Sequence, residues 1–227
     1  MFLSRRSTQA EYSDAPGLPF EVVAQNYADL AKINRLFAFA EPFQRCMVNW
    51  LGKDNVKTLR LLDLGAGDGS LGRTLESWAS KKGWQWSVTS LDLNSEALRL
   101  NPGRRNVVGS VLALPFTDAC FDVVIASQMT HHIDRQEDVA CHFREAWRVT
   151  RGALFLTDLH RNPCLLVIVW LSCVLGGLSR HMRADGVISI QRGWRVREWR
   201  RLAEQAGIKD AKTWLYFGSR IILRARK

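Results

Sequence analysis

The sequence predicts an α/β fold in which helices cover both faces of a mostly parallel β-sheet. From residue 58 onward, short apolar runs alternate with amphipathic stretches of helical period. In the run LLDLGAGDGSLG (61–72), the end of the first apolar run is followed directly by a glycine-rich stretch. The chain has 227 residues, of which 47% are hydrophobic and 24% charged, as in an ordinary globular domain.

Two helices are expected before the alternating part. Apolar side chains recur at helical spacing over 20–37, and a second helix covers 41–51 with Pro42 in its first turn. Residues 1–19 are polar and include two prolines, so we expect them to be poorly ordered.

The alternating part provides the sheet. Strands are expected at 58–64, 84–93, 106–111, 121–127, 152–159, 211–217 and 219–227. Helices are expected at 70–82, 94–100, 135–150 and 196–207, with a further apolar helix at 164–178 and then a loop around 181–186. Crossover helices make successive strands parallel, whereas a hairpin through Gly218 adds an antiparallel last strand. Ligands of such sheets bind at the carboxyl ends of the strands.

The glycines fit two spacings at once. Gly65, Gly67 and Gly69 give G-x-G-x-G. Gly67, Gly69 and Gly72 give G-x-G-x-x-G, the dinucleotide fingerprint. Both spacings let backbone approach a ligand closely. Asp92, at the end of the second strand, suits a ribose diol in either case and does not discriminate.

Two aspartates do discriminate between cofactors. Asp68 lies just ahead of the helix N-terminus, where it would repel a pyrophosphate that binds there. Asp63 lies among leucines in the first strand and needs a partner, either loop N–H groups or an ammonium group. S-adenosylmethionine carries a sulfonium and an ammonium group and no phosphate. The aspartates therefore favour S-adenosylmethionine over a nicotinamide dinucleotide.

The run LLDLGAGDGSLGRTL resembles the glycine loop of class I S-adenosylmethionine-dependent methyltransferases. SLDLN (90–94) is similar to their ribose-binding segment, and GSVLALPFTDACFDVVIASQMTHHI (109–133) to their adenine segment and fourth strand. Over about 59–160 the resemblance implies a Rossmann-like, seven-stranded methyltransferase sheet. That sheet is mostly parallel with an antiparallel last strand, and an N-terminal and an inserted helical cap accompany it.

The resemblance also implies domains and cofactor contacts. The segments are an N-terminal helical cap (1–57), a cofactor-binding α/β core (58–160), an inserted apolar helix and loop of the substrate cap (161–195), and a C-terminal helix with closing strands (196–227). The implied cofactor-binding residues are Asp63, Gly65, Ala66, Gly67, Asp92, Leu93, Ser110, Val111 and Gln128. Ser110 departs from the family, which usually has an acid there for the adenine amino group, so we expect a modest loss of cofactor affinity.

Flanking segments resemble a narrower group. ADLAKINRLF (28–37), TDLHRNP (157–163) and GVISIQRGW (186–194) are similar to bacterial small-molecule O-methyltransferases associated with type III polyketide synthases. This resemblance implies secondary metabolism and O-methylation of a phenolic, polyketide or quinone-like acceptor, with S-adenosylhomocysteine as the other product. Methylation of RNA or protein, and C- or N-methylation of a small molecule, stay open as alternatives.

Histidine is the usual general base for a hydroxyl acceptor. His131 and His132 follow the fourth strand and His160 follows the fifth, all at the carboxyl edge, so these three are the candidate catalytic residues. The alternative for His131 and His132 is a purely structural pair. No cluster of oxygen ligands is visible in the sequence, so no metal is expected.

The acceptor pocket is expected to be hydrophobic. Aromatic and apolar residues of the cap would close it or pack only against one another: Tyr27, Phe37, Phe39, Phe43, Trp50, Trp170 and Leu171. The apolar segment 164–178 is shorter than the roughly 20 residues of a membrane-spanning helix. It is expected to be a buried cap helix, part of a dimer interface, or a peripheral membrane contact.

Charge and cysteine content restrict the partners and the compartment. The net charge of +10 permits attraction to nucleic acid, but the basic residues are spread and no binding motif is present, so nucleic acid is not expected. Five cysteines without a C-x-x-C pair favour reduced thiols, and the lack of a signal peptide favours a cytoplasmic protein. Either a monomer or a homodimer is expected.

Overall fold

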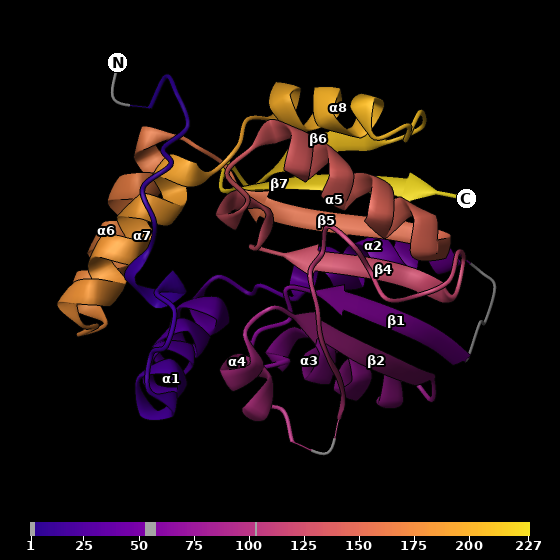
Figure 1. The fold of residues 1–227 in the computed structure, drawn as a ribbon, viewed down its shortest axis with the longest axis horizontal. Coiled ribbons are helices and arrows are strands. Elements are labelled where there is room, and N and C mark those ends of the chain that lie inside the picture. The colour runs from indigo at the N-terminus through magenta and orange to yellow at the C-terminus, as the bar shows by residue number, and fades with distance from the viewer. Residues whose placement is uncertain (1–2, 53–57, 103) are drawn as a thin grey trace.

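A computed structural model describes residues 3–52, 58–102 and 104–227 and shows a seven-stranded sheet (Figure 1). The strands are β1 (Thr58–Leu64), β2 (Gln85–Asp92), β3 (Arg105–Val108), β4 (Phe121–Ser127), β5 (Thr150–Leu159), β6 (Lys212–Tyr216) and β7 (Arg220–Arg226). Their order is β3-β2-β1-β4-β5-β7-β6, with β1 to β5 parallel and β7 antiparallel to both of its neighbours. The expected sheet, including its antiparallel last strand, is confirmed.

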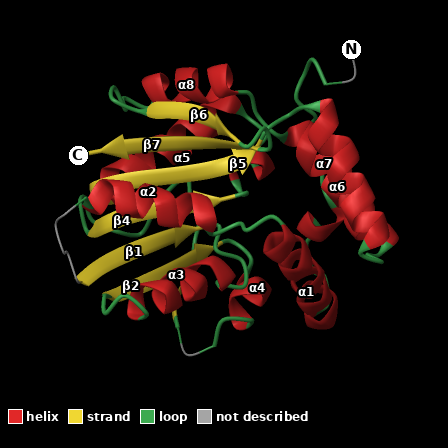
Figure 2. Ribbon diagram, turned by 180° about the vertical axis from the view of Figure 1, so that it is seen from behind, coloured by secondary structure: helices red, strands yellow, loops and turns green. Residues whose placement is uncertain are grey.

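Helices cover both faces of this sheet (Figure 2). The helical elements are η1 (Tyr12–Asp14), α1 (Phe20–Leu36), α2 (Glu41–Leu51), α3 (Ser70–Ser80), α4 (Ser95–Arg99), η2 (Thr130–His132), α5 (Gln136–Val149), α6 (Pro163–Leu175), α7 (Arg180–Arg192) and α8 (Val196–Gln205). One buried cluster joins α5 and α8 to the sheet, and a second joins α2 and α3 to it. Leu62 contributes to the first cluster and Leu61 to the second, because successive side chains of a strand point to opposite faces.

The strand order places the ligand crevice. β1 lies between β2 and β4, so the chain reverses its direction of winding at the carboxyl ends of β1 and β4. The loop after β1 and the segment after β4 therefore meet at one edge, which we call the carboxyl edge. α1, α6 and α7 lie at this edge, whereas α2 belongs to the layer that covers the sheet (Figures 1 and 2). The described residues 3–52 thus lie partly at the carboxyl edge and partly in the layer over the sheet.

The expected loop around 181–186 is wrong, because these residues belong to helix α7. The Ser179 hydroxyl accepts a hydrogen bond from the Met182 N–H at 3.2 Å and caps the helix. Gly186 allows a close approach to α6, since a Cβ there would lie 3.1 Å from Cγ1 of Val169. A mid-helix glycine resembles a turn signal in the sequence, but here it packs two helices together as the α6–α7 hairpin (163–192).

The expectation of poor order at the N-terminus is also wrong for the described residues 3–19, which we call the N-terminal strap. The Arg6 guanidinium donates hydrogen bonds to carbonyl groups of residues 131, 133, 134 and 192 at 2.6–3.0 Å. The Asp185 carboxylate accepts the backbone N–H groups of Tyr12 and Ser13 at 2.7 and 3.0 Å. The sequence did not reveal this order, because every one of these bonds joins residues far apart in the sequence and a polar segment has no local pattern that indicates such bonds.

No helix among the described residues is long and apolar enough to cross a membrane. The five cysteines all lie in the described ranges and are free thiols.

Candidate active site

The glycine loop after β1 is held open by backbone geometry. Gly65, Gly67 and Gly69 have φ angles of 64°, 55° and 70°, in the left-handed region that glycine adopts freely. The N–H groups of Gly65 and Ala66 donate to the Leu91 carbonyl at 2.8 and 3.1 Å. The loop is therefore tied to the end of β2, and its backbone is presented at the carboxyl edge.

Asp92 is positioned by the loops on either side of it. Its carboxylate accepts the N–H of Gly67 at 2.7 Å and the N–H of Asn94 at 2.8 Å. Burial raises the pKa of Asp92, while these two N–H groups and the nearby imidazole of His132 counteract the rise. The acid thus links the glycine loop to Asn94, the N-cap residue of α4.

Asp63 is a buried carboxyl group with an unused acceptor. Its Oδ2 atom makes no hydrogen bond to any described residue. Burial, and then the carboxylates of Asp92 and Asp68, raise the pKa of Asp63 to about 8, against a lowering by the Gly72 N–H. An orphaned buried acid is unfavourable unless a partner arrives. A cationic group such as the ammonium of S-adenosylmethionine fits this requirement, and a phosphate does not.

Two side chains stand over the loop. A Cβ on Gly67 would lie 2.5 Å from Cε1 of Tyr27, which comes from α1. A Cβ on Gly65 would lie 2.7 Å from Cβ of Met129, which follows β4. Burial and the nearby carboxylates of Asp92 and Asp68 raise the pKa of Tyr27, so the phenol stays neutral. Larger residues at Gly65 and Gly67 would collide with Met129 and Tyr27, respectively.

Asp68 discriminates less than the sequence suggests. Its Oδ2 forms an ion pair with Arg73 at 3.2 Å, and its Oδ1 accepts the Ser70 N–H at 3.0 Å. Its charge is partly neutralised within the protein, so it repels an anion more weakly than an isolated carboxylate would. Asp63 has no cationic side chain beside it in the described structure, so the preference for a cationic cofactor over a pyrophosphate rests mainly on Asp63.

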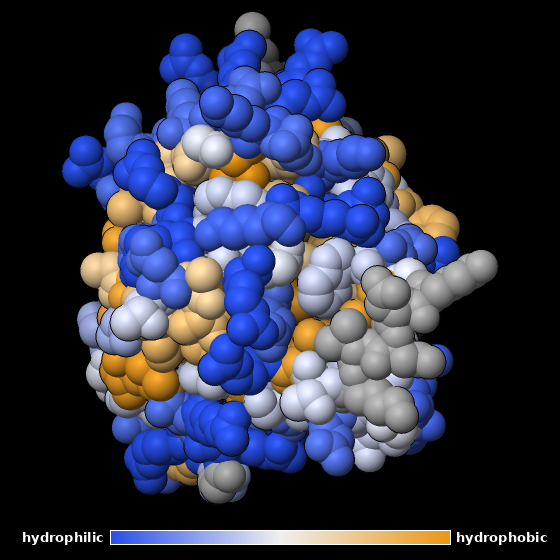
Figure 3. All heavy atoms as spheres, turned by 90° about the vertical axis from the view of Figure 1, so that its right-hand side faces the viewer, coloured by the Kyte–Doolittle hydropathy of each residue, from blue (hydrophilic) through white to orange (hydrophobic). Residues whose placement is uncertain are grey.

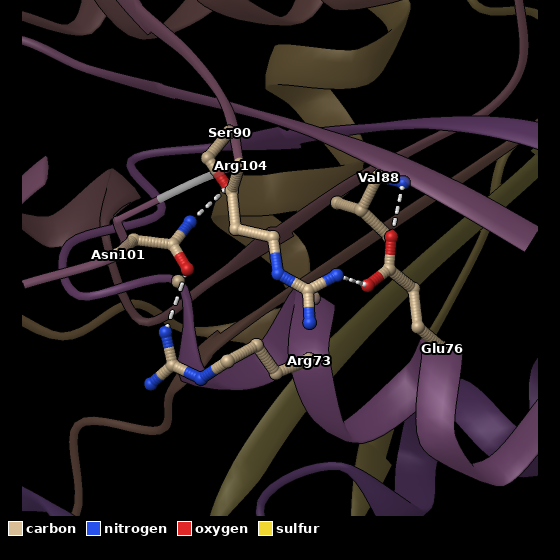
Figure 4. A pocket seen from close by; sticks show the side chains of 8 residues that line it. Arg73, Glu76, Val88, Ser90, Asn101 and Arg104 are labelled. Carbon is tan, nitrogen blue, oxygen red and sulfur yellow. Dashed lines mark hydrogen bonds and ion pairs between the residues drawn. The ribbon is translucent and has the colours of Figure 1, made fainter.

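The back of the loop is a polar network around Asn101 (Figure 4). Asn101 donates from Nδ2 to the Ser90 hydroxyl at 3.2 Å, and its Oδ1 accepts from Arg73 at 2.7 Å. A Cβ on Gly69 would collide with the Asn101 amide. The small hollow between these residues is lined by mutually bonded groups, so we interpret it as a wall that fixes the loop.

The acceptor side begins with His131, which is buried between two carboxylates. Asp158 accepts both the His131 backbone N–H and its Nδ1–H at 2.7 Å, and the Glu11 carboxylate lies 3.5 Å from Nε2. Burial opposes the imidazolium charge, but Asp158 and Glu11 raise the pKa of His131 to about 10. The same pairing outweighs burial at Glu11 and lowers its pKa to about 2. His131 is therefore protonated near neutral pH and has no lone pair to act as a base.

His132 has a different environment. Its Nδ1 lies 2.8 Å from the Asp14 carboxylate, which belongs to the strap, and its side chain is only partly buried. Nε2 makes no hydrogen bond within the described residues. His132 is close enough to Asp92 to lower the pKa of that carboxyl group, so the imidazole lies on the cofactor side of the carboxyl edge. Of the three candidate histidines, His132 is the one that the structure brings to the cofactor side of the carboxyl edge with a ring nitrogen free.

His160 lies at the end of β5 but faces the C-terminal hairpin. Its backbone N–H donates to the Ser219 carbonyl at 2.9 Å, and its Nδ1 lies 3.0 Å from the Asn162 amide nitrogen. Burial, together with Arg195 and Arg161, lowers the pKa of His160. The charged groups near it are Arg161, Arg195 and Glu198, the last two at the N-terminal end of α8. The structure does not bring His160 to the glycine loop.

The other predicted cofactor residues lie at the ends of the strands beside the loop. Gln128 has a φ of 52°, unusual for a residue with a side chain, and its N–H donates to the Thr157 carbonyl at 2.9 Å. Leu93 is 75% exposed, a free apolar surface directly after Asp92. The Ser110 hydroxyl accepts the Leu112 N–H at 3.2 Å, and Val111 follows it in the same turn. Their contacts with a cofactor stay predictions.

Sequence reasoning missed the partners of both histidines. Glu11 and Asp14 lie in the strap, and no local pattern links them to residues 131 and 132. The one usable signal in the sequence is Asp158, an acid at the apolar end of a strand, where a carboxylate needs a partner.

The predicted aromatic pocket is not assembled as expected. Phe43 is fully buried in the core, and Trp50 packs against the backbone of Gly152. Trp170 is 47% exposed on the outside of α6. Of that set, Tyr27 is the residue in contact with the glycine loop.

One group among the described residues has metal-ligand geometry. Ligand atoms of Glu11, His131 and His132 lie within 4.8 Å of one another. Each histidine of the group has carboxylate partners: Glu11 and Asp158 flank His131, and Asp14 pairs with His132. We interpret the group as an ion-pair network.

Comparison with known proteins agrees with this geometry. Residues 62–156 match the family described as a methyltransferase domain. Over 163 residues, or 66% of the chain, the sequence is 29% identical to squalene methyltransferase 1 of Botryococcus braunii. The matched region is 38% of that protein's length, so the chain spans well under half of this curated relative.

Solved structures share the fold. An S-adenosylmethionine-dependent methyltransferase from Aquifex aeolicus matches with a TM-score of 0.62 at 14% identity, covering 92% of this chain and 98% of that one. The plantazolicin methyltransferase, in complex with S-adenosylhomocysteine, matches with a TM-score of 0.67 at 12% identity, covering 91% and 90%. At these identities the likeness establishes the fold. Together with the family match, it identifies residues 62–156 as a class I S-adenosylmethionine-dependent methyltransferase domain, a transferase domain with that cofactor.

Proposed function

We propose that the protein methylates a hydrophobic small molecule, and that the acceptor atom is an oxygen of a phenolic, polyketide or quinone-like compound. The observation that supports this most strongly is the His132–Asp14 pair, in which His132 is close enough to Asp92 to lower the pKa of that acid. A histidine with one nitrogen held by a carboxylate and the other free is the usual arrangement of a general base.

The cofactor would be held by the residues of the carboxyl edge. Asp92 would accept hydrogen bonds from the ribose diol, and Asp63 would pair with the ammonium group. The glycine-loop backbone, Leu93, Ser110, Val111 and Gln128 would contact the remainder. When bound, S-adenosylmethionine supplies an electrophilic methyl group.

His132 would accept the proton that a hydroxyl acceptor loses when it is methylated. Asp14 would hold the imidazole in the tautomer that leaves Nε2 free, and it would stabilise the imidazolium that forms. His131 would act as a positioning residue, because its buried ion pairs fix η2 and hence the backbone of His132. His160 is the weakest of the three candidates, since its surroundings lie on the α8 side.

A second candidate is methylation at carbon. The relative in Botryococcus braunii is named for squalene, a hydrocarbon, so its methyl acceptor must be a carbon atom. The hydrophobic character of that substrate agrees with the proposed class of acceptor, while the chemistry differs. Methylation of RNA, of protein, or at a nitrogen of a small molecule would use the same cofactor site, and the net charge of +10 favours RNA among these three.

An acceptor panel separates these candidates. The enzyme is incubated with methyl-labelled S-adenosylmethionine and, separately, with alkylphenols, hydroquinones, squalene, total RNA or a protein extract, and products are identified by mass spectrometry. We expect label on the oxygen of a phenol or hydroquinone. Label found only in squalene, RNA or protein would contradict the proposal.

Variants test the proposed base on whichever phenol reacts. His132→Asn should lower turnover by about 10²- to 10⁴-fold with little change in cofactor affinity, and Asp14→Asn should lower it less. His160→Asn serves as the matched control and should retain turnover. Full turnover of His132→Asn would remove the base from the mechanism.

A further inference from the structure

The outer face of α6 is an unusual apolar surface. It consists of side chains that are 44–86% exposed: Val167, Ile168, Trp170, Leu171 and Leu175. No other helix in the described structure contributes more than one large exposed hydrophobic side chain. Exposed apolar patches of this kind mark surfaces that bind a protein or a membrane.

The opposite side of α6 is already satisfied within the fold. Cys173 is fully buried and packs with Leu178 and Met182, and Leu30 and Ile33 of α1 cover this cluster. The outer face therefore has no partner in the described chain. α6 is also too short to span a bilayer, since 13 residues rise only about 20 Å as a helix against a hydrocarbon core of about 30 Å. An exposed apolar face on a helix too short to span a bilayer can bind only at the surface of a membrane.

The charged residues near this face favour an anionic membrane over a second copy of the chain as its partner. Residues 159–184 contain no Asp or Glu, and neither do residues 30–40 of the adjoining α1 region. Exposed cations stand in both segments: Lys32, whose ammonium also pairs with Asp29 at 2.7 Å, and Arg35 in α1, and Arg180 next to the exposed His181 at the start of α7. A basic rim around an apolar face complements anionic lipid headgroups. A second copy of this chain would instead bring its own basic rim against the first, which disfavours a dimer through this face.

The position of the face relates it to the active site. α6 starts four residues after the end of β5, where Asp158 holds His131, and the α6–α7 hairpin and α1 lie at the carboxyl edge (Figures 1 and 2). The face at the other end of the strands carries many hydrophilic side chains with hydrophobic patches between them (Figure 3). A membrane on the outer face of α6 would thus lie on the catalytic side of the molecule.

We propose that the outer face of α6, with its rim of Lys32, Arg35 and Arg180, docks on an anionic phospholipid membrane, so that the catalytic edge takes its hydrophobic acceptor from the bilayer. The docking rests on the surface itself and holds whichever atom is methylated. Only the statement about the acceptor depends on the proposed function.

Flotation with phospholipid vesicles tests the docking. Wild-type protein is mixed with vesicles of phosphatidylcholine and phosphatidylglycerol, or of phosphatidylcholine alone, at low and high salt. We expect binding to the mixed vesicles, weaker binding to the neutral ones, and a decrease with salt because screening weakens the contribution of the basic rim.

A matched pair of double variants locates the surface. Leu171→Ser with Leu175→Ser removes two side chains that are 44% and 86% exposed. Leu215→Ser with Phe217→Ser removes two that are 40% and 78% exposed on and beside β6. The first should weaken vesicle binding by at least about tenfold, since two large apolar side chains no longer insert, and the second should leave it unchanged. Both should bind S-adenosylhomocysteine as the wild type does, which shows that they fold and that a failed docking is distinct from a failed cofactor site.

Equal vesicle binding by both double variants would overturn the proposal. So would a lack of vesicle binding by the wild type, including the case in which ultracentrifugation reveals a dimer that Leu171→Ser with Leu175→Ser dissociates.

Discussion

The two halves of the carboxyl edge are built in different ways. The cofactor half, around Asp63, the glycine loop and Asp92, comes from about 30 consecutive residues and is held mainly by backbone hydrogen bonds. The acceptor half joins the N-terminal strap, η2 and the end of β5 through side-chain ion pairs, and α7 through hydrogen bonds from Arg192 to backbone carbonyl groups. The first half depends on contacts between residues close together in the sequence. The second depends on direct ion pairs between residues far apart in the sequence.

The largest expected effect is on stability, and it belongs to the acceptor half. Asp158→Ala removes the fully buried carboxylate that accepts both N–H groups of His131. Breaking one partner of a buried ion pair costs about 3–5 kcal/mol, so the free energy of unfolding should fall by that amount. Urea denaturation measures it, with the exposed Asp210→Ala as control. Equal losses in the two variants would show that the ion-pair network does not hold this half together.

The cofactor half should respond in affinity more than in stability. Asp92→Ala removes the acid that bridges the N–H groups of Gly67 and Asn94. We expect the dissociation constant for S-adenosylhomocysteine to rise about 10- to 100-fold, as for a lost charged hydrogen bond. Calorimetry measures it, again against Asp210→Ala. An unchanged affinity would place the ribose elsewhere.

Sequence reasoning succeeded and failed along the same division. Gly65, Gly67, Asp63 and Asp92 could be placed because apolar periodicity, glycine spacing and strand order are local properties. The sheet followed from the same signals. Glu11 and Asp14 could not be assigned, since their roles depend on His131 and His132, more than 100 residues away, and a polar N-terminus has no periodic pattern that would reveal such pairing.

The pH dependence of stability is a smaller effect that also belongs to the acceptor half. The pKa of His131 is raised from 6.5 to about 10, so its contribution is complete below about pH 6.5 and is lost as the pH rises toward 10. The pKa of Glu11 is lowered from 4.5 to about 2, so its contribution is complete above about pH 4.5 and is lost as the pH falls toward 2. The stability difference between wild type and Glu11→Gln should therefore be largest between about pH 4.5 and 6.5.

Urea denaturation at a series of pH values measures this difference. Glu21→Gln, at an exposed position in α1, is the control and should differ from wild type by a small and nearly constant amount. A Glu11→Gln difference that is flat from acidic to alkaline pH would mean that Glu11 and His131 are not paired in solution.

We propose that the orphaned Asp63 carboxyl group pairs with the cationic group of the cofactor, and this pairing is the central claim about the cofactor half. Its raised pKa of about 8 leaves it mostly protonated at pH 7, and an ammonium partner would favour the ionised form. Calorimetric titration with S-adenosylhomocysteine at pH 7, in buffers of different ionisation enthalpy, measures the protons released on binding. We predict release of about one proton by the wild type and almost none by Asp63→Asn. Equal proton release by the two proteins, or binding of a reduced nicotinamide in place of S-adenosylhomocysteine, would contradict this account.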